Sequence, residues 1–314
     1  KAIADSLLSG ERKAVLLGNA AAQHPQASSL LALANWIADQ TGATVGYLTE
    51  AANTVGAQLV DALPGDGGLD AGQMLSGSLK ACLLLNVEPA LDAADPHAAT
   101  SALDAAEMVI SLTPFKSAAA DVADVMLPIA PFSETSGTFV NAEGRVQSFH
   151  GVVRPLLDAR PAWKVLRVLG NMLGLPGFAF ETSEEVRSEA LTGDVAARLS
   201  NRSSAAVANS AESDELERIA DVPIYCTDSL VRRAVSLQLT ADAAPPAAGL
   251  STAVWTRLGL ADGDAVRISQ GDADVRLPAK HDPSLARNAV RVPAGHPATV
   301  TLGAMFGPIS VAKA

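Results

Sequence analysis

The first half of the chain alternates short apolar runs with stretches that have helical periodicity. Apolar runs at 14–17, 45–48, 81–87, 108–112 and 125–128 predict strands. Leu30, Leu33 and Ile37 recur at helical spacing and predict a helix over 28–40, which Gly42 ends. The run at 81–87 is apolar at almost every position, as expected for a parallel strand covered on both faces. This alternation predicts an α/β fold: an open parallel Rossmann-like sheet with flanking helices.

Two further helices are predicted after this region. A short helix is expected over 101–106, and a longer one over 161–173, with Pro161 in its first turn and Gly174 after its last. One face of the longer helix is predicted to be apolar, from Val165, Leu166, Leu169 and Met172. Thr182 with Glu185 forms a capping-box pattern that predicts the start of another helix.

The composition and hydrophobic pattern of the sequence change twice, which predicts three regions. Residues 1–190 form the predicted α/β domain. Residues 191–248 are rich in Ser, Ala, Asn and Glu, contain Pro245-Pro246, and predict a connector with short helices. Residues 249–314 predict a small β-barrel: a helix at 253–258, a turn at Asp262-Gly263-Asp264, and strands at 265–269, 275–279 and 290–293.

A hairpin is predicted at 134–147, where the sequence is ETSGTFVNAEGRVQ. The segment Asn141–Gly144 predicts a tight turn between two extended arms. Gly137 and Gly144 are both expected to adopt positive φ, because glycine has no Cβ to oppose that conformation.

Charge and length restrict the possible functions. The chain has 314 residues, 23 Lys and Arg, 34 Asp and Glu, and a net charge of −11. It contains no basic run, so a nucleic-acid-binding protein is excluded and docking on an anionic membrane is opposed. No apolar run approaches the roughly 20 residues that span a bilayer, and no signal peptide is evident. The first residue is Lys rather than Met, which indicates a fragment.

The search for catalytic or metal-binding motifs finds none. Cys82 and Cys226 are too far apart for a Cys-x-x-Cys motif, and the five histidines have no metal-ligand spacing. No dinucleotide fingerprint, phosphate-binding loop or nucleophile elbow is present. The paired carboxylates at 184–185 and 214–215 are predicted to be solvated. We therefore predict no catalytic residue and no metal ligand, and single out only His296, which follows a predicted barrel strand.

Several motifs resemble known families. Ala-Asp-Val-Met-Leu-Pro at 123–128, followed by the 134–147 segment, resembles the molybdopterin oxidoreductase superfamily. Residues 258–266 and 292–296 resemble the double-psi β-barrel that closes those proteins. Finer similarity is to the family of the large iron–sulfur subunit, or G subunit, of bacterial NADH:quinone oxidoreductase, respiratory complex I. It is carried by PAWKVLRVLGN at 161–171 and by shorter motifs at 50–57, 87–89, 223–225, 228–234 and 305–309.

This resemblance implies that the chain itself binds no cofactor and catalyses no reaction. In that family, iron–sulfur clusters upstream carry electrons from NADH towards quinone, and the two separated thiols here cannot ligate such a cluster. The chain would then be a cofactor-free structural and interaction portion, soluble, on the cytoplasmic side of the bacterial inner membrane. Its partners would be other subunits of the peripheral arm. The alternatives are part of a catalytic molybdopterin-dependent enzyme such as a formate dehydrogenase, or an unrelated sugar- or nucleotide-binding α/β protein.

One departure from the molybdenum enzymes bears on cofactor binding. Where their strand end usually contains Gly-x-Asn-Pro, this chain has Asn86-Val87-Glu88-Pro89. Glu88 would place a carboxylate near a cofactor phosphate, and two like charges about 4 Å apart repel by about 4 kcal/mol at an effective dielectric constant of about 20. We expect a vestigial pocket, bordered by Glu88, Asp124 and His296, that holds water and no cofactor.

Overall fold

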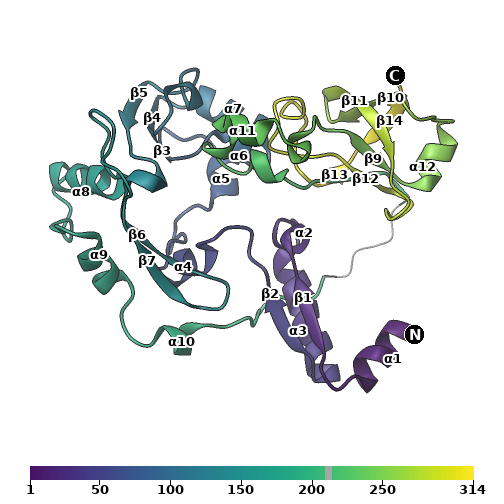
Figure 1. The fold of residues 1–314 in the computed structure, drawn as a ribbon, viewed down its shortest axis with the longest axis horizontal. Helices are drawn as coiled ribbons and strands as arrows, with labels where there is room; N and C mark the ends of the chain where they lie inside the picture. Colours follow the sequence, from purple (N-terminus) through teal and green to yellow (C-terminus); the bar gives the residue numbers. More distant parts are fainter. Residues whose placement is uncertain (209–213) are drawn as a thin grey trace. The chain divides into compact units, whose positions relative to one another are not determined.

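A computed structural model describes residues 1–208 and 214–314 and divides into two compact units (Figure 1). Unit 1 comprises Lys1–Gly65, Gly137–Phe149 and Phe180–Glu212; unit 2 comprises Asp66–Ser136, His150–Ala179 and Ser213–Ala314. Part of the predicted connector, residues 209–213, lies outside the described residues. The domain limits at 190 and 248 stay predictions, because compact units defined by contacts need not coincide with folding domains.

Unit 1 is built on a two-stranded parallel sheet. Strands β1 (Ala14–Leu17) and β2 (Thr44–Tyr47) pair in register and are connected through α3 (Ala27–Thr41). Gly42 ends that helix with φ +71°, as predicted. The remaining helices of unit 1 are α1 (Ala2–Ser9), α2 (Asn19–Ala22), α4 (Thr54–Leu59), α9 (Ser183–Ala190) and α10 (Val195–Arg198).

The predicted hairpin is confirmed in unit 1. Strands β6 (Gly137–Val140) and β7 (Val146–Phe149) pair antiparallel. The turn between them is fixed by Asn141, whose Oδ1 accepts hydrogen bonds from the backbone N–H groups of Glu143 and Arg145, and Gly144 has φ +81°. The expectation of positive φ at Gly137 is wrong. Glycine is required there for space, because a Cβ would lie 2.8 Å from the Phe149 ring.

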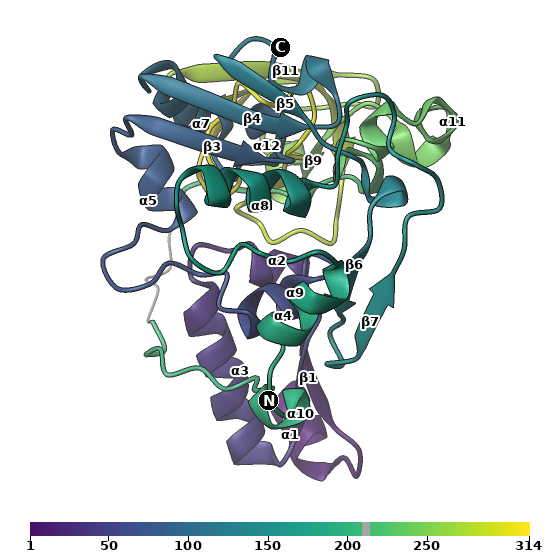
Figure 2. The same ribbon diagram turned by 90° about the vertical axis from the view of Figure 1, so that its left-hand side faces the viewer.

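Unit 2 contains a parallel sheet in the order β3-β4-β5, seen in the upper part of Figure 2. The strands are β3 (Ala81–Leu85), β4 (Met108–Thr113) and β5 (Val125–Pro128). Leu84, Val109 and Leu103 of α7 (Pro96–Asp104) form a core on one face. On the other face, Leu83 is 44% exposed and Leu85 is 43% exposed. The prediction that this strand is covered on both faces is therefore wrong for the described chain: β3 is an edge strand with helix packing on one side.

The other helical elements of unit 2 lie around this sheet and the barrel. They are α5 (Ala71–Ser76), α6 (Pro89–Asp92), α8 (Ala162–Met172), α11 (Val235–Gln238) and the single turns η1 (Lys116–Ala118), η2 (Phe132–Glu134), η3 (Ile224–Cys226), η4 (Val231–Arg233) and η5 (Ala241–Ala243). The long predicted helix is confirmed as α8, with Pro161 as its N-cap and Gly174 at φ +69° after it. Met172 does not belong to the packed face, because it is 80% exposed in the last turn.

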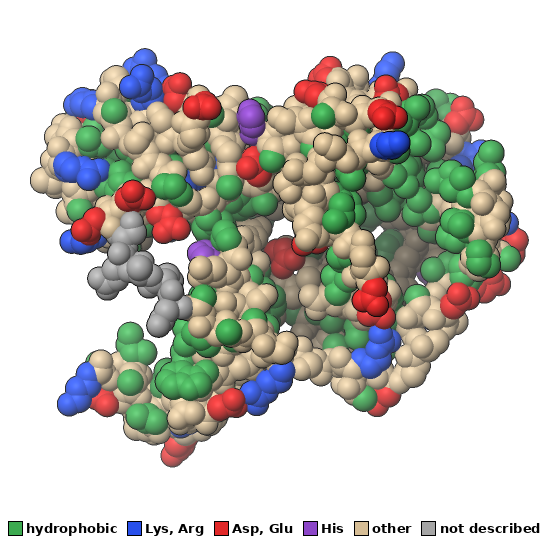
Figure 3. All heavy atoms as spheres, turned by 180° about the vertical axis from the view of Figure 1, so that it is seen from behind, with side chains coloured by type: hydrophobic (Ala, Val, Ile, Leu, Met, Phe, Trp, Pro, Cys, Tyr) green, Lys and Arg blue, Asp and Glu red, His purple; other side chains and the backbone are tan. Residues whose placement is uncertain are grey.

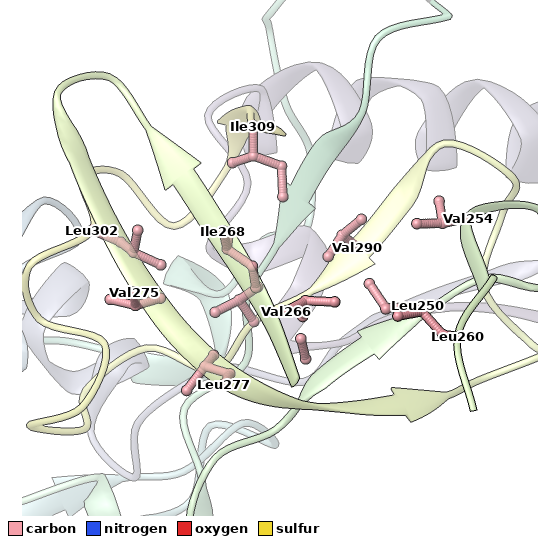
Figure 4. Packing of buried hydrophobic residues seen from close by; sticks show 12 residues of the cluster. Leu250, Val254, Leu260, Val266, Ile268, Val275, Leu277, Val290, Leu302 and Ile309 are labelled. Atoms are coloured by element: carbon pink, nitrogen blue, oxygen red, sulfur yellow. The ribbon is translucent and has the colours of Figure 1, made fainter. Parts of the chain in front are cut away.

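The barrel region is a seven-stranded barrel-like sheet in the order β13-β8-β12-β9-β11-β10-β14. Its strands are β8 (Glu217–Ile219), β9 (Ala248–Leu250), β10 (Ala265–Gln270), β11 (Ala273–His281), β12 (Ala289–Arg291), β13 (Gly307–Pro308) and β14 (Ser310–Lys313). The helix α12 (Thr252–Arg257) follows β9. Inward-pointing aliphatic side chains from these elements meet in one core, including Leu250, Val266, Ile268 and Val290 (Figure 4). The mixed α/β fold with parallel sheets and a terminal barrel is thus confirmed at this level.

Two turns and one buried cation hold the barrel. Strands β10 and β11, predicted at 265–269 and 275–279, pair antiparallel as a hairpin, and Gly263 has φ +92° in the turn before it. Arg218 on β8 is only 1% exposed, and its guanidinium donates to Gln270 Oε1 at 3.1 Å and to the carbonyl oxygens of Gly303 and Ala304 at 3.0 and 3.1 Å. Burial lowers the pKa of Arg218 to about 10, which leaves it protonated at neutral pH. Among the described helices, none has the length and apolar character required to cross a bilayer.

Candidate functional site

The candidate site lies at the carboxyl end of β3, where the chain turns into α6. Asn86 adopts φ +52°, an uncommon conformation for a residue with a Cβ, and its N–H donates to the Leu112 carbonyl at 2.8 Å. Glu88 is the N-cap of α6, and Pro89 occupies the first turn. The Glu88 side chain thus projects from the tight turn, Asn-Val-Glu-Pro, that connects β3 to α6.

Glu88 is the centre of a four-residue ion-pair network. Its Oε2 lies 2.7 Å from Arg232 Nη1 and its Oε1 lies 2.5 Å from Arg233 Nη2. Arg232 also pairs with Asp92, and the other Asp92 oxygen accepts a hydrogen bond of 2.6 Å from the Glu88 N–H. Two carboxylates and two guanidinium groups therefore meet in one place with no net charge.

Backbone carbonyls and a ring hold the two arginines in position. Arg232 Nε donates to the Cys226 carbonyl at 2.9 Å. Arg233 donates to the Ser229 carbonyl at 3.0 Å and to Ser117 Oγ at 3.2 Å, and its guanidinium lies 4.5 Å from the centre of the Phe115 ring. The donors of both arginines are therefore directed at acceptors within the protein.

The centre of the network is buried, whereas Asp92 and Arg233 at its margin are 25% and 30% exposed. The side chains of Glu88 and Arg232 are 7% and 10% exposed. Burial by itself raises the pKa of Glu88, but the hydrogen bonds from Arg233 and Arg232 outweigh burial and hold this pKa below its ordinary value. Glu88 is consequently ionised at neutral pH, as a partner in an ion pair. The sequence-based picture of Glu88 as an unpaired charge is corrected in this respect.

Sequence reasoning missed the three partners of Glu88. Arg232 and Arg233 lie more than 140 residues away along the chain, and no local periodicity links them to β3. The available signal was the Arg-Arg pair in the 228–234 motif, two adjacent cations in an acidic chain. Asp92 could have been predicted as a neighbour of Glu88, because it lies one helical turn after it.

The structure places the other two predicted pocket residues differently. Asp124 lies at the amino end of β5, where its Oδ2 accepts a hydrogen bond from the Val109 N–H at 2.7 Å. Glu88 follows the carboxyl end of β3. Because the strands are parallel, the two carboxylates lie at opposite ends of the strands of this sheet.

His296 lies on the Glu88 side of unit 2. Its neighbour Gly295 packs so tightly that a Cβ there would be 3.2 Å from the Leu91 carbonyl of α6. His296 Nδ1 accepts from the Ala298 N–H at 3.0 Å, and burial lowers the pKa of His296. Gly295 therefore lies against α6, the helix that Glu88 caps, and a water-filled pocket bordered by Glu88 and His296 stays a prediction.

A separate cavity of about 560 Å³ lies within unit 1. It borders the carboxyl end of β2 and the first turn of α3, and its lining includes Ser28, Tyr47, Thr49, Gln58, Arg198 and Asn201. The carboxyl edge of parallel strands is where ligands bind in open α/β sheets. Across residues 1–208 and 214–314, no group of three or more His, Cys, Asp and Glu side chains is arranged to hold a metal ion.

Comparison with known proteins identifies the family. The molybdopterin oxidoreductase family matches residues 1–172, which is more than half of the 314 residues. The chain belongs to the molybdopterin oxidoreductase family. The β3–β5 sheet, the hairpin and the whole of α8 fall within the residues that match this family.

Within this family, the chain is similar to subunits of several oxidoreductases. It is 32% identical over 227 residues to the G subunit of NADH-quinone oxidoreductase from Mycobacterium tuberculosis, covering 69% of this chain and 27% of that protein. It is 36% identical over 143 residues to the corresponding protein of Streptomyces coelicolor, covering 42% of this chain and 17% of that protein. The similarity to this subunit that the motifs indicate is confirmed.

Two further relatives extend the comparison. The chain is 33% identical over 112 residues to subunit alpha of F420-dependent formate dehydrogenase 1 of Methanococcus maripaludis, covering 35% of this chain and 17% of that protein. The solved structure of acetylene hydratase from Pelobacter acetylenicus superposes with a TM-score of 0.52 at 16% identity, covering 75% of this chain and 44% of that one, which shows a shared fold. The chain spans about a quarter of the length of the mycobacterial G subunit that it matches, 27% of that protein.

Proposed function

We propose that this chain is a cofactor-free structural and interaction portion of the large iron–sulfur subunit, the G subunit, of a bacterial NADH:quinone oxidoreductase. In this proposal, iron–sulfur clusters elsewhere in the subunit carry the electrons, and the chain catalyses nothing alone. Its partners are other subunits of the peripheral arm, on the cytoplasmic side of the inner membrane, and its seven-stranded sheet is a double-psi barrel. The similarity to a mycobacterial G subunit over 69% of the chain supports this assignment.

The observation that carries the cofactor-free part is the Glu88 network. A pterin nucleotide has phosphate groups, which proteins bind with arginine forks and other donors that carry net positive charge. At the end of β3, both guanidinium groups are already paired with Glu88 and Asp92. A phosphate would have to displace a buried carboxylate from its arginine, or enter beside it as a third anion. The residues present at this edge therefore do not fit a pterin phosphate.

The test is the metal and pterin content of the purified protein. We expect molybdenum, iron and zinc well below one equivalent by elemental analysis, and no fluorescence from oxidised pterin. A molybdenum-containing formate dehydrogenase, purified from the same host grown with molybdate, is the positive control. Stoichiometric molybdenum or pterin in this chain would overturn the proposal.

That outcome would favour the second candidate function, part of a catalytic molybdopterin-dependent oxidoreductase. Two observations speak for it: the similarity to a formate dehydrogenase subunit, and the 560 Å³ cavity at the carboxyl end of β2. The same measurement separates the two candidates, because only the catalytic one requires a bound cofactor.

A further inference from the structure

A loop at 151–159 in unit 2, between the hairpin and α8, exposes apolar side chains to an unusual degree. Val152 is 84% exposed, Val153 59%, Leu156 71% and Leu157 85%. Surface loops that only connect elements are normally polar, and a group of exposed aliphatic side chains in one short segment marks an interaction site.

The loop is held in place by hydrogen bonds to the rest of unit 2. At its start, the Val152 N–H donates to the Ser133 carbonyl at 2.8 Å, and in its middle the Leu156 N–H donates to a carboxylate oxygen of Glu134 at 3.2 Å. At its end, Arg160 Nη1 donates to the carbonyls of Leu157 and Ala159 at 3.1 and 2.8 Å. The loop backbone is thus fixed while its aliphatic side chains point to solvent.

Leu157 combines two unfavourable features. It adopts φ +50°, a left-handed conformation that costs a residue with a Cβ on the order of 1–3 kcal/mol, and it is the most exposed leucine of the loop. Nothing within unit 2 requires a leucine at this position for packing, since the side chain is 85% exposed. A strained, pre-ordered and exposed leucine is suited to enter a pocket on another molecule with little loss of conformational entropy.

The charge around the loop differs from that of the whole chain. Four of the 23 Lys and Arg residues fall within 150–175, but only one of the 34 Asp and Glu residues does. Arg154, Arg160 and Lys164 are all exposed, in or directly after the loop. Even with Asp158 in the loop and Glu134 against it, an otherwise acidic molecule with a net charge of −11 thus has an excess of positive charge beside its exposed leucines.

α8 carries exposed apolar and basic side chains from its first turn to its last. Lys164, Val168 and Met172 follow one another at a spacing of four residues, so they lie on one face of the helix, and all three are exposed. Figure 3 shows hydrophobic side chains gathered towards its right-hand edge, the side of the molecule that carries α8. The loop and α8 follow one another directly in the chain, and both present exposed apolar and basic side chains.

We propose that this surface docks an acidic protein partner, with Leu156 and Leu157 as the anchors and Arg154, Arg160 and Lys164 as the rim. A second copy bound through the same surface is disfavoured, because the two basic rims would repel each other. An anionic bilayer is disfavoured by the charge of −11 on the whole chain. An acidic protein surface with an apolar pocket satisfies both the leucines and the rim.

The test is photo-crosslinking in the native cell. A benzophenone amino acid replaces Leu157 in the full protein, and a matched variant carries it at Leu239, which is 82% exposed outside this surface. We expect light to join the Leu157 variant to a peptide of a different polypeptide with net negative charge, identified by mass spectrometry, and the Leu239 variant to give no such product. Adding Arg154→Glu should reduce the yield severalfold, whereas Arg12→Glu, a charge reversal at an exposed residue of unit 1, should leave it unchanged.

Several outcomes would overturn the inference. They are crosslinks to lipid, to a second copy or within the same chain, a yield no greater than that of the Leu239 control, and a yield insensitive to Arg154→Glu. Failure of this proposal can be told apart from failure of the proposed function, because crosslinking and pterin content are measured independently.

Discussion

Replacing Arg232 by methionine tests whether the Glu88 network stabilises the fold. The substitution keeps an unbranched apolar side chain in place of the arginine stem and removes the guanidinium. Glu88, 7% exposed, would keep only Arg233, and Asp92 would keep only the Glu88 N–H. Removing one partner of a buried ion pair typically costs 3–5 kcal/mol, because the other charge remains in a medium of low polarity. Since Arg233 still neutralises part of the charge, we expect a loss of about 3 kcal/mol in the free energy of unfolding.

Urea unfolding at neutral pH measures this loss, and a surface ion pair provides the control. Arg202 pairs with Asp39 at 2.9 Å, but the two side chains are 67% and 52% exposed. Arg202→Met should therefore leave the unfolding midpoint nearly unchanged, because solvent screens an exposed pair. A midpoint for Arg232→Met as close to the parent as that of Arg202→Met would refute the reasoning.

The pH dependence of stability gives an independent check on the same network. The pKa of Glu88 is lower in the folded protein than its ordinary value of 4.5, so its contribution is complete above that ordinary value. The contribution is lost as pH falls through the lowered folded pKa. The Glu88→Gln variant should therefore be less stable than the parent at pH 7, and the difference should shrink on acidification below about pH 4.5. A difference that stays constant with pH would mean that Glu88 acts through packing alone.

Three other predictions concern the barrel and the connector. Gly263→Val should lower the free energy of unfolding by roughly 1–3 kcal/mol, because φ +92° is strained for valine, whereas Gly65→Val, in open space at ordinary φ, should have little effect in the same thermal melt. Arg218→Met should cost roughly 2–5 kcal/mol, because buried carbonyl oxygens lose their donors; an equally stable variant by urea unfolding would contradict this. Limited proteolysis should cut first between Thr192 and Glu215, in the polar part of the predicted connector that precedes the buried strand β8, and first cuts within 81–112 would contradict the predicted connector.

The secondary structure of the first half could be predicted because its signals are local. Each apolar run is bounded by turn residues, so strands such as β4 and β5 begin where the sequence indicates. Gly42 and Gly174 marked helix ends through their positive φ, which follows from the absence of a Cβ. Gly137 did not follow the same rule, because the need for glycine there comes from the Phe149 ring, on the partner strand of the hairpin.

Burial and ion pairing could not be predicted in the same way, because they depend on residues distant in sequence. The run at 81–87 has the composition of a strand buried on both faces, yet which faces are covered depends on what packs against it. The sequence singles out Glu88 as a departure from the pattern of the molybdenum enzymes. Its neutralisation by Arg232 and Arg233 could not be predicted, because these residues lie more than 140 positions further along the chain and only the fold brings them to Glu88.

The position of β3 at the edge of its sheet has a consequence for handling the isolated chain. An edge strand with unpaired backbone groups and exposed leucines is a template for edge-to-edge aggregation. Copies of this chain repel one another through a net charge of −11, and that repulsion reaches about 30 Å at 0.01 M salt but only about 3 Å at 1 M. Ionic strength therefore governs colloidal stability. At low salt concentration, charge repulsion keeps the β3 strands of different molecules apart, and at high salt concentration they can approach closely enough to pair.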